Sequence, residues 1–154
     1  MTVAEKLVEL YKASGKTCST AESCTGGGIG SAITAVAGSS EVFLGGIISY
    51  ANSVKHGVLG VKEETLATVG AVSSETAAEM AEGARRLTGA DVAVAVTGIA
   101  GPGGGSTEKP VGLVWFGLAT DRGVRTEKAL FPGDRAQVRA ATVTHALGML
   151  TTAV

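Results

Sequence analysis

Residues 17–37 read TCSTAESCTGGGIGSAITAVA. Thr17 to Ala21 predicts a short strand. The apolar-rich segment Ile29 to Ala37, which stops at Gly38, predicts a helix that the chain enters through a glycine turn. A strand, a turn and a helix in this order are a building unit of α/β folds. Open α/β sheets hold their ligands at the carboxyl ends of strands, so the turn after Ala21 is a candidate site.

Elements on either side of this unit continue the alternation. The predicted helices span residues 3–13, 63–69, from Ser73 or Ser74 to Leu87, and from Asp134 almost to Val154; the predicted strands are Val42–Tyr50, Val92–Val96, Val111–Leu118 and Val124–Phe131. Val42–Tyr50 has the apolar composition of a buried strand, even with its two glycines. Val92–Val96 is short and apolar, which is typical of a central strand covered on both faces.

The last two predicted strands, separated by Ala119 to Gly123, indicate an antiparallel hairpin. Alternating helices and strands with one hairpin predict an α/β fold, a three-layer αβα sandwich with a mixed sheet. No repeat or linker interrupts the pattern, and 154 residues is a usual size for one domain. We therefore expect a single domain over residues 1–154.

Composition narrows the class of protein. The chain is 45% hydrophobic and 18% charged, which is typical of a folded domain. Its net charge of −1 lacks the positive excess expected of a nucleic-acid-binding protein or a polybasic membrane anchor. No signal peptide and no run of about 18 apolar residues is present, so we expect a cytoplasmic protein with no nucleic-acid or membrane partner. Cys18 and Cys24 are expected to be buried free thiols.

Glycine makes up 23 of the 154 residues, about twice its usual share. Nine of these glycines fall in two clusters, Gly26–Gly30 and Gly98–Gly105, and each cluster comes shortly after a predicted strand. Neither cluster fits the dinucleotide fingerprint or the phosphate-binding loop G-x-x-x-x-G-K-[ST]. Bare backbone can approach a ligand closely, so both clusters are candidate site loops, whereas the scattered glycines are expected to close turns.

Ser23 lies between the first predicted strand and the glycine turn. A serine there projects from the sheet edge while the following N–H groups can stabilise an oxyanion, as in the nucleophile elbow of hydrolases, although the sequence is not G-x-S-x-G. The alternative is that Ser23 caps the next helix. A serine nucleophile needs a base, and Lys55 qualifies if burial lowers its pKa; otherwise it is a solvent-exposed lysine. His145 is better explained as a packed core residue and His56 as a solvated one.

Arg135 follows Asp134 at the start of the last predicted helix. An arginine beside the free N–H groups of a helix N-terminus suits a phosphate or carboxylate ligand. The alternative is a surface ion pair with Asp134. No His-Glu-x-x-His motif and no paired Cys-x-x-Cys occurs, so we expect no metal.

Five motifs occur together and in order over nearly the whole chain. They are Thr20–Gly27 (TAESCTGG), Ser49–Asn52 with Lys55, Gly70–Ser73 (GAVS), Thr97–Pro102 (TGIAGP) and Lys109–Gly112 (KPVG). This set resembles the CinA C-terminal family, the nicotinamide-nucleotide amidohydrolases or NMN deamidases. Many members carry an additional N-terminal pyrophosphatase-type domain, and this chain resembles the stand-alone form.

The resemblance implies hydrolysis of nicotinamide mononucleotide to nicotinate mononucleotide and ammonia, in pyridine-nucleotide salvage and without a cofactor. It implies that Ser23 is the nucleophile, Lys55 the general base and Tyr50 a supporting hydroxyl. Thr97 matches a polar position of the family site. Arg135 matches a position that assists substrate binding.

Substrate contacts are also expected from the backbone. The turn after Ser23 would supply oxyanion donors, and either Arg135 or the second glycine loop would hold the substrate phosphate. The expected substrate-binding residues are Thr25, Gly26, Gly27, Thr97, Gly98, Gly101 and Arg135. Family members associate, so a homodimer or higher homo-oligomer is expected. Two alternatives stay open, a nucleotide-sensing or protein-binding module without turnover and an amidase for another carboxamide.

Overall fold

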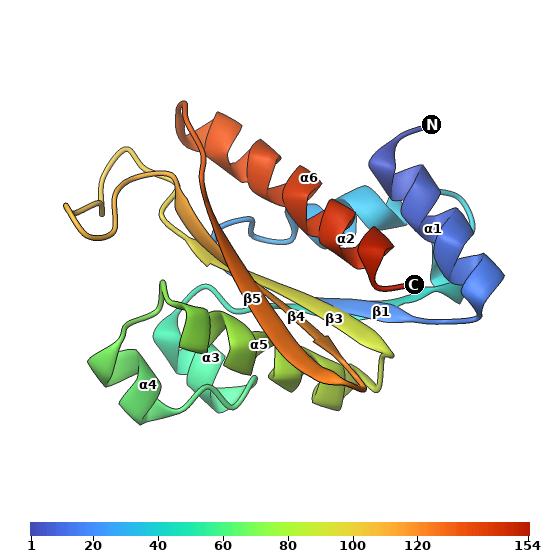
Figure 1. The fold of residues 1–154 in the computed structure, drawn as a ribbon, viewed down its shortest axis with the longest axis horizontal. Coiled ribbons are helices and arrows are strands. Elements are labelled where there is room, and N and C mark those ends of the chain that lie inside the picture. Colours follow the sequence, from blue (N-terminus) through green and yellow to red (C-terminus); the bar gives the residue numbers. More distant parts are fainter.

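A five-stranded sheet lies between two layers of helices in the computed structural model, which describes all residues 1–154 (Figure 1). The strands are β1 (Cys18–Glu22), β2 (Phe43–Ile48), β3 (Val92–Gly98), β4 (Leu113–Thr120) and β5 (Gly123–Leu130), in the order β2-β1-β3-β4-β5. β1 pairs in parallel with β2 and β3, and β4 pairs antiparallel with β3 and β5. The predicted αβα sandwich with a mixed sheet and a hairpin is confirmed.

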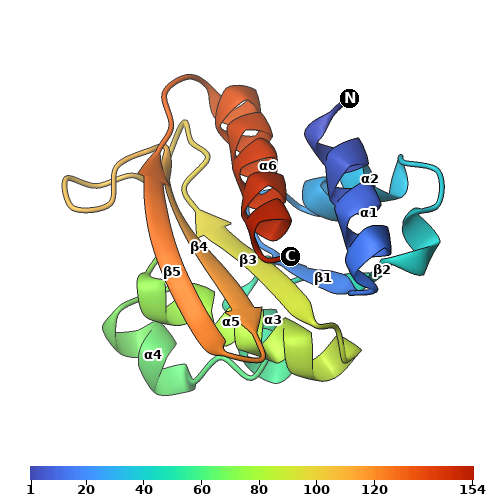
Figure 2. The same ribbon diagram turned by 45° about the vertical axis from the view of Figure 1, so that its right-hand side comes forward.

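The helices divide evenly between the two faces of the sheet. One face carries α1 (Val3–Ser14), α2 (Gly28–Thr34) and α6 (Arg135–Thr152), and the other carries α3 (Asn52–Gly57), α4 (Glu63–Thr68) and α5 (Ser74–Thr88) (Figures 1 and 2). A cluster of 21 buried apolar residues fills the first interface and a cluster of 9 fills the second. Burial of these side chains on both faces is the main force that holds the layers together.

Local capping explains where the long helices begin. Ser73 accepts a hydrogen bond from the Thr76 N–H at the start of α5, so of the two serines that could cap this helix it is Ser73 that does so. Asp134 and Gln137 form a reciprocal capping box at the start of α6. Each such cap satisfies N–H groups that the first helical turn leaves free.

β3 is buried along nearly its whole length, which confirms the prediction of a central strand. The prediction of a buried strand over Val42–Tyr50 is wrong in its burial. β2 lies at the edge of the sheet with only β1 beside it, and Leu44 and Ile48 are exposed. Composition alone does not distinguish a central strand from an edge strand, because the number of neighbouring strands depends on the order of the strands in the folded sheet.

Two boundaries also differ from the predictions. The helix predicted over Ile29–Ala37 stops at Thr34, and the short 3-10 helix η1 (Ser39–Glu41) follows Gly38, whose φ of 87° needs a glycine. The hairpin strands extend further than expected, because Ala119 pairs with Val124 and Thr120 with Gly123. Only two residues remain in the turn. No helix in the structure combines the length and apolar character needed to cross a membrane.

The sheet brings the two glycine clusters to one end of the molecule. β1 and β3 run parallel, with Glu22 opposite Val96, so Ser23 and Thr97 lie where the two neighbouring strands end. The Ser23 N–H donates to the Val96 carbonyl and extends this pairing by one step. Carboxyl ends of parallel strands are where open α/β sheets place ligand sites.

Candidate active site

The turn after β1 presents Ser23 at the end of the sheet. The Gly26 N–H donates to the Ser23 carbonyl at 3.1 Å, and the Gly28 N–H donates to the Thr25 carbonyl at 3.0 Å, which closes two successive turns. Gly26 and Gly27 have φ values of 57° and 103°, in the left-handed region that favours glycine. Gly27 is the N-cap of α2, so the alternative that Ser23 caps this helix is wrong.

Lys55 extends from α3 to the Ser23 hydroxyl. Its side chain is 1% exposed, so the alternative of a solvent-exposed lysine is wrong. Its Nζ lies 3.0 Å from Ser23 Oγ and donates to the Ser49 and Tyr50 carbonyls at 2.8 Å each. A serine hydroxyl and a buried amine thus meet at hydrogen-bond distance, as a nucleophile and base require.

Burial controls the protonation of this amine. Loss of hydration lowers the pKa of Lys55 from its ordinary value of 10.5, and the nearby Cys24 partly opposes this by raising the pKa. In the neutral amine the two remaining N–H groups match the two carbonyl acceptors. The nitrogen lone pair is then left facing Ser23 Oγ, which is the orientation needed to accept the hydroxyl proton.

A cavity of about 210 Å³ opens beside this pair, and we call it the serine cavity. It is lined by Ser23, Cys24, Tyr50, Asn52, Lys55, Ala71, Val72, Thr97, Gly98, Ala100 and Arg135. Six of the residues predicted from the sequence therefore line one cavity. The other four, Thr25, Gly26, Gly27 and Gly101, lie beside it without lining it.

Thr97 and Gly98 form the wall at the end of β3. The buried Thr97 hydroxyl donates to the Ala71 carbonyl at 2.8 Å and so holds the loop before α5 against the cavity. A Cβ at Gly98 would lie 2.7 Å from Val114 Cγ2 and 2.8 Å from the Leu113 carbonyl oxygen. Glycine at this position therefore permits close packing against β4.

Arg135 bridges two sides of the cavity mouth. Its guanidinium donates to the Gly101 carbonyl at 2.8 Å and lies 3.4 Å from the Tyr50 hydroxyl. No ion pair joins it to Asp134, so that alternative is wrong. Tyr50 is 63% exposed and contacts Lys55 through its backbone carbonyl, while its hydroxyl points to Arg135.

Three N–H groups of the turn after Ser23 have no partner within the protein. They belong to Cys24, Thr25 and Gly27, whereas the Gly26 N–H is used within the turn. A free N–H directly after a nucleophile is the usual first donor to an oxyanion. Cys24 is both the residue after Ser23 and part of the cavity lining.

Glu22 organises this turn, although the sequence indicated no role for it. Its carboxylate, 2% exposed, accepts hydrogen bonds from the Thr25 hydroxyl at 2.6 Å, the Ile29 N–H at 2.8 Å and the Gly30 N–H at 3.0 Å. These bonds tie the end of β1 to the start of α2. The sequence did contain a signal for this role. Glu22 is an acidic residue at the end of a strand of small residues, shortly before the glycine turn, and a buried carboxylate there needs hydrogen-bond donors.

Arg139 supports the same turn from α6. Its Nε donates to the Cys24 carbonyl at 3.0 Å and its Nη2 to the Thr25 carbonyl at 3.1 Å. No sequence signal could have revealed this contact, because Arg139 is 115 residues from Cys24 along the chain.

The two histidines lie outside the serine cavity. His145 packs against Phe116, with ring centroids 4.2 Å apart, and its Nε2 lies 3.2 Å from the Glu127 carboxylate. Its side chain is 33% exposed, so it is packed as predicted but lies at the margin of the core. His56 contacts the Val61 carbonyl and has a half-exposed side chain.

Cys18 and Cys24 are buried free thiols, as predicted, and burial raises the pKa of Cys24 to about 11.

The whole chain matches a known protein family. A family described as the CinA C-terminal domain matches residues 1–154. The chain is similar to the crystal structure of the competence/damage inducible protein CihA from Agrobacterium tumefaciens, with a TM-score of 0.95 and 48% identity, over 97% of this chain and 92% of that one. It is also similar to a competence-damaged protein (CinA) superfamily protein from Escherichia coli, with a TM-score of 0.94 and 35% identity, over 99% and 88% of the two chains.

Relatives of two lengths share this sequence. The nicotinamide-nucleotide amidohydrolase PncC of Escherichia coli strain K12 is 50% identical over 151 residues, which is 97% of this chain and 92% of that protein. A CinA-like protein of Synechococcus sp. strain RCC307 is 48% identical over 97% of this chain. The chain spans only 36% of that relative and 35% of two relatives from Thermoanaerobacter.

Proposed function

This chain belongs to the CinA C-terminal domain family, and from that premise we propose that it is a hydrolase of a linear amide bond. The substrate is nicotinamide mononucleotide, and the products are nicotinate mononucleotide and ammonia. Support comes from the 50% identity to a nicotinamide-nucleotide amidohydrolase of nearly the same length.

The observation that carries this function is the buried contact between Ser23 and Lys55. Lys55 Nζ and Ser23 Oγ are 3.0 Å apart, and both residues line a cavity large enough for an aromatic ring that carries a carboxamide group. Burial lowers the pKa of Lys55, so a larger fraction of the amine is neutral near physiological pH. This arrangement supports a serine nucleophile with a lysine base.

Acylation begins when the Lys55 lone pair takes the Ser23 hydroxyl proton and Oγ attacks the carboxamide carbon. The carbonyl oxygen becomes an oxyanion, and the free N–H of Cys24, which lines the cavity, is its first donor. As the tetrahedral intermediate collapses, the carbon–nitrogen bond breaks. The Lys55 ammonium returns its proton to the leaving nitrogen, which departs as ammonia.

Deacylation repeats these roles with water in place of the serine. Neutral Lys55 takes a proton from a water molecule, and the oxygen attacks the acyl-enzyme carbon. The same N–H group stabilises the second oxyanion. Ser23 Oγ leaves with the proton from Lys55, which regenerates the hydroxyl and releases the carboxylate product.

The substrate phosphate binds at the cavity mouth beside Arg135. Its guanidinium, held by the Gly101 carbonyl and close to the Tyr50 hydroxyl, is the positive charge of the cavity rim. A guanidinium at a helix N-terminus is suited to a phosphate. Because Gly101 presents its carbonyl oxygen to Arg135, we assign the phosphate to Arg135 rather than to the Gly101–Gly105 loop.

We also infer one domain over residues 1–154 that acts in the cytoplasm, where its nucleotide substrate is found. Both apolar clusters pack on the same sheet, which supports a single domain. Leu44 and Ile48 on the edge strand are 48% and 57% exposed, which supports a homodimer or higher homo-oligomer. Light scattering on the purified chain tests this, because a monomer has a mass of 15.3 kDa.

Ammonia release from nicotinamide mononucleotide tests the function directly. We expect release by the wild-type protein and its loss in Ser23→Ala, by at least about 10³-fold, since the nucleophile is removed. Ser31→Ala is the matched control, because Ser31 is an exposed serine of the neighbouring helix. Mass spectrometry of the quenched reaction should find a nicotinoyl group on the peptide that contains Ser23.

The alternatives give different results in the same assay. Unchanged release by Ser23→Ala would remove the nucleophile assignment. Binding of nicotinamide mononucleotide without ammonia release would favour a nucleotide-sensing module. Faster release from glutamine, nicotinamide or nicotinamide riboside would indicate an amidase for another carboxamide.

A further inference from the structure

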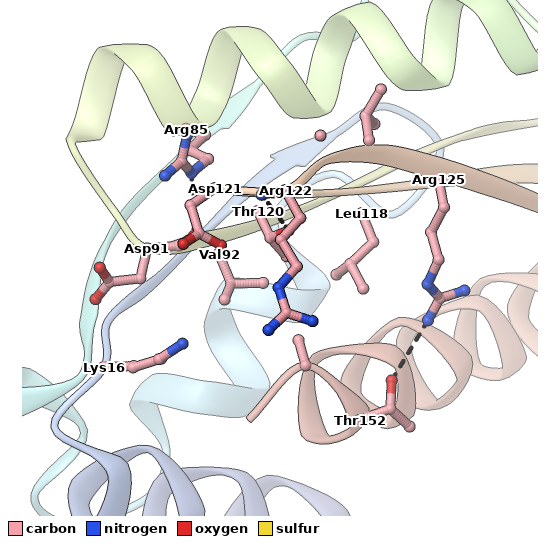
Figure 3. A pocket seen from close by; sticks show the side chains of 13 residues that line it. Lys16, Arg85, Asp91, Val92, Leu118, Thr120, Asp121, Arg122, Arg125 and Thr152 are labelled. Carbon is pink, nitrogen blue, oxygen red and sulfur yellow. Dashed lines mark hydrogen bonds between the residues drawn. The ribbon is translucent and has the colours of Figure 1, made fainter.

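A second cavity, larger than the serine cavity, lies at the opposite end of the sheet. Figure 3 shows it from close by. Its volume is about 560 Å³, and we call it the basic cavity. It forms where β3 begins, where β4 turns into β5, and where α6 ends. Val92 lines the basic cavity and Thr97 lines the serine cavity, so five residue steps along β3, about 17 Å of extended chain, separate them.

Four basic side chains converge on the basic cavity from separate parts of the chain. They are Lys16 after α1, Arg85 on α5, Arg122 in the β4–β5 turn and Arg125 on β5. Asp91 and Asp121 are the acidic residues of the lining, which leaves an excess of two positive charges. This excess is local, because the whole chain has a net charge of −1.

The carboxylates of the cavity lining do not pair with these side chains, and only Arg125 has an ion-pair partner, the Glu127 carboxylate beside the cavity at 3.9 Å. No ion pair joins any of the four basic residues to Asp91 or Asp121. Asp91 instead accepts two hydrogen bonds from Thr17. The Lys16 ammonium and the Arg122 guanidinium have no protein partner, and both point into the same space (Figure 3).

Arg85 and Arg125 are held at the wall of the cavity. The Arg85 Nε donates to the Asp91 carbonyl at 3.0 Å, which leaves its terminal nitrogens free. Arg125 lies 3.4 Å from the Thr152 hydroxyl (Figure 3). The Lys16 ammonium, the Arg122 guanidinium and the terminal nitrogens of Arg85 are like charges without an acceptor, so an anionic ligand between them would be bound with a gain in free energy.

Part of the lining is apolar. Val124 and Ala153 are partly exposed and form this surface, and the buried Val92 and Leu118 lie behind it. A bare phosphate or sulfate would use only the basic groups. A ligand with a flat, weakly polar ring as well as phosphates would use both parts of a cavity of this size.

We propose that the basic cavity binds a nucleoside diphosphate or triphosphate. The phosphates lie among Lys16, Arg122 and the free nitrogens of Arg85, the base contacts the partly exposed Val124 and Ala153, and the Asp121 carboxylate accepts from a ribose hydroxyl. Two or more negative charges on the ligand match the positive charges of Lys16, Arg85 and Arg122, which form no ion pair. The cavity is concave and the rest of the chain has no positive excess, so a small molecule fits better than a nucleic acid or a lipid surface.

Titration of ADP into the ¹⁵N-labelled wild-type protein tests this site apart from any turnover. We expect saturable amide shifts at Val92, Arg122 and Gly123, without matching shifts at Gly26 and Gly27 beside the serine cavity. Inorganic pyrophosphate should bind the same amides but about tenfold more weakly, because it lacks a base to cover the apolar lining.

Two variants locate the binding. Lys16→Gln with Arg122→Gln should weaken ADP binding at least about tenfold and leave ammonia release unchanged, because both residues are far from Ser23. Arg135→Gln should leave ADP binding at the basic cavity unchanged. The inference is overturned if ADP causes no saturable shift at millimolar concentration or shifts only the serine cavity. It is equally overturned if pyrophosphate binds as tightly as ADP, or if the double variant binds ADP as well as the wild type does.

Discussion

The reactivity of this protein depends first on single residues, and Lys55 is the one whose surroundings matter most. Its ammonium is buried among two backbone carbonyls and one serine hydroxyl, with no carboxylate partner. Neutral acceptors compensate a buried positive charge less completely than an ion pair does. The result is a lower pKa and an amine that can act as a base.

This lowered pKa predicts how activity changes with pH. A base works in its deprotonated form, so kcat/KM should rise as pH increases through the pKa of Lys55 and level off above it. Since burial lowers this pKa from 10.5, the rise should be centred below that value. A pH–rate profile of ammonia release measures it.

Lys55→Arg is the matched control for the pH profile. Arginine keeps the positive charge but does not deprotonate, so the variant should lose activity by about 10²–10⁴-fold at every pH. A wild-type profile that falls as pH rises from 6 to 9, or a fully active Lys55→Arg, would contradict the role of Lys55 as base.

Arg139 offers a second prediction at the scale of a residue. Its bonds to the Cys24 and Thr25 carbonyls orient the peptide groups of the turn after Ser23, so Arg139→Gln should disturb the proposed oxyanion donors. We expect kcat to fall about 10–100-fold with little change in KM, because Arg139 does not line the serine cavity.

Two further variants separate this positioning role from a loss of folding. Arg139→Lys can restore one of the two hydrogen bonds and should recover part of kcat. Arg122→Gln removes an arginine at the other end of the sheet and should leave kcat unchanged. A higher KM with unchanged kcat in Arg139→Gln would instead indicate that Arg139 contacts the substrate.

Among the helices and strands, two helical glycines have opposite surroundings. Gly83 on α5 packs directly against the Leu59 carbonyl, where an added methyl group would overlap the backbone. Gly148 on α6 has open space at the same position. Helix propensity favours alanine at both sites, so the surroundings decide the sign of the substitution.

Chemical denaturation of the two variants measures this difference. Gly83→Ala should lower the free energy of unfolding by about 1–3 kcal/mol through overpacking. Gly148→Ala should raise it by about 0.5–1 kcal/mol, because alanine loses less backbone entropy in a helix. A shift of both midpoints in the same direction would show that the close packing of α5 on the Leu59 segment does not control stability.

For the molecule as a whole, α1 and α6 join the two ends of the chain on one face of the sheet (Figure 2). The buried Tyr11 hydroxyl donates to the Leu150 carbonyl at 2.8 Å, across 139 residues of sequence. Burial raises the pKa of Tyr11, so the hydroxyl stays protonated and keeps donating. This bond links the first helix to the last within the larger apolar cluster.

Tyr11→Phe tests this link. The substitution leaves a buried carbonyl without its donor, and we expect the free energy of unfolding to fall by about 1–3 kcal/mol. Circular dichroism and tryptophan fluorescence should report the same midpoint if the chain unfolds as one domain. Tyr50→Phe is the control, because Tyr50 is exposed and should change stability little. Two separate midpoints would contradict a single domain.

Much of this organisation could be read from local patterns. The strand–turn–helix around Ser23, the caps at Ser73 and Asp134 and the central strand β3 depend on residues a few positions apart, and the structure agrees with each. The family could likewise be recognised, because its motifs are short continuous segments. Side-chain chemistry within one turn or strand is enough to determine such features.

Tertiary structure alone decided the rest. Ser23 and Lys55 are 32 residues apart, and Arg139 is 115 residues from the turn that it supports. Strand order, which local sequence does not encode, also places β2 at the edge of the sheet and the two cavities at its opposite ends. Sequence determined which residues were available for the chemistry. Burial and distant contacts set their pKa values and orientations, because desolvation and hydrogen bonding depend on every group nearby in space.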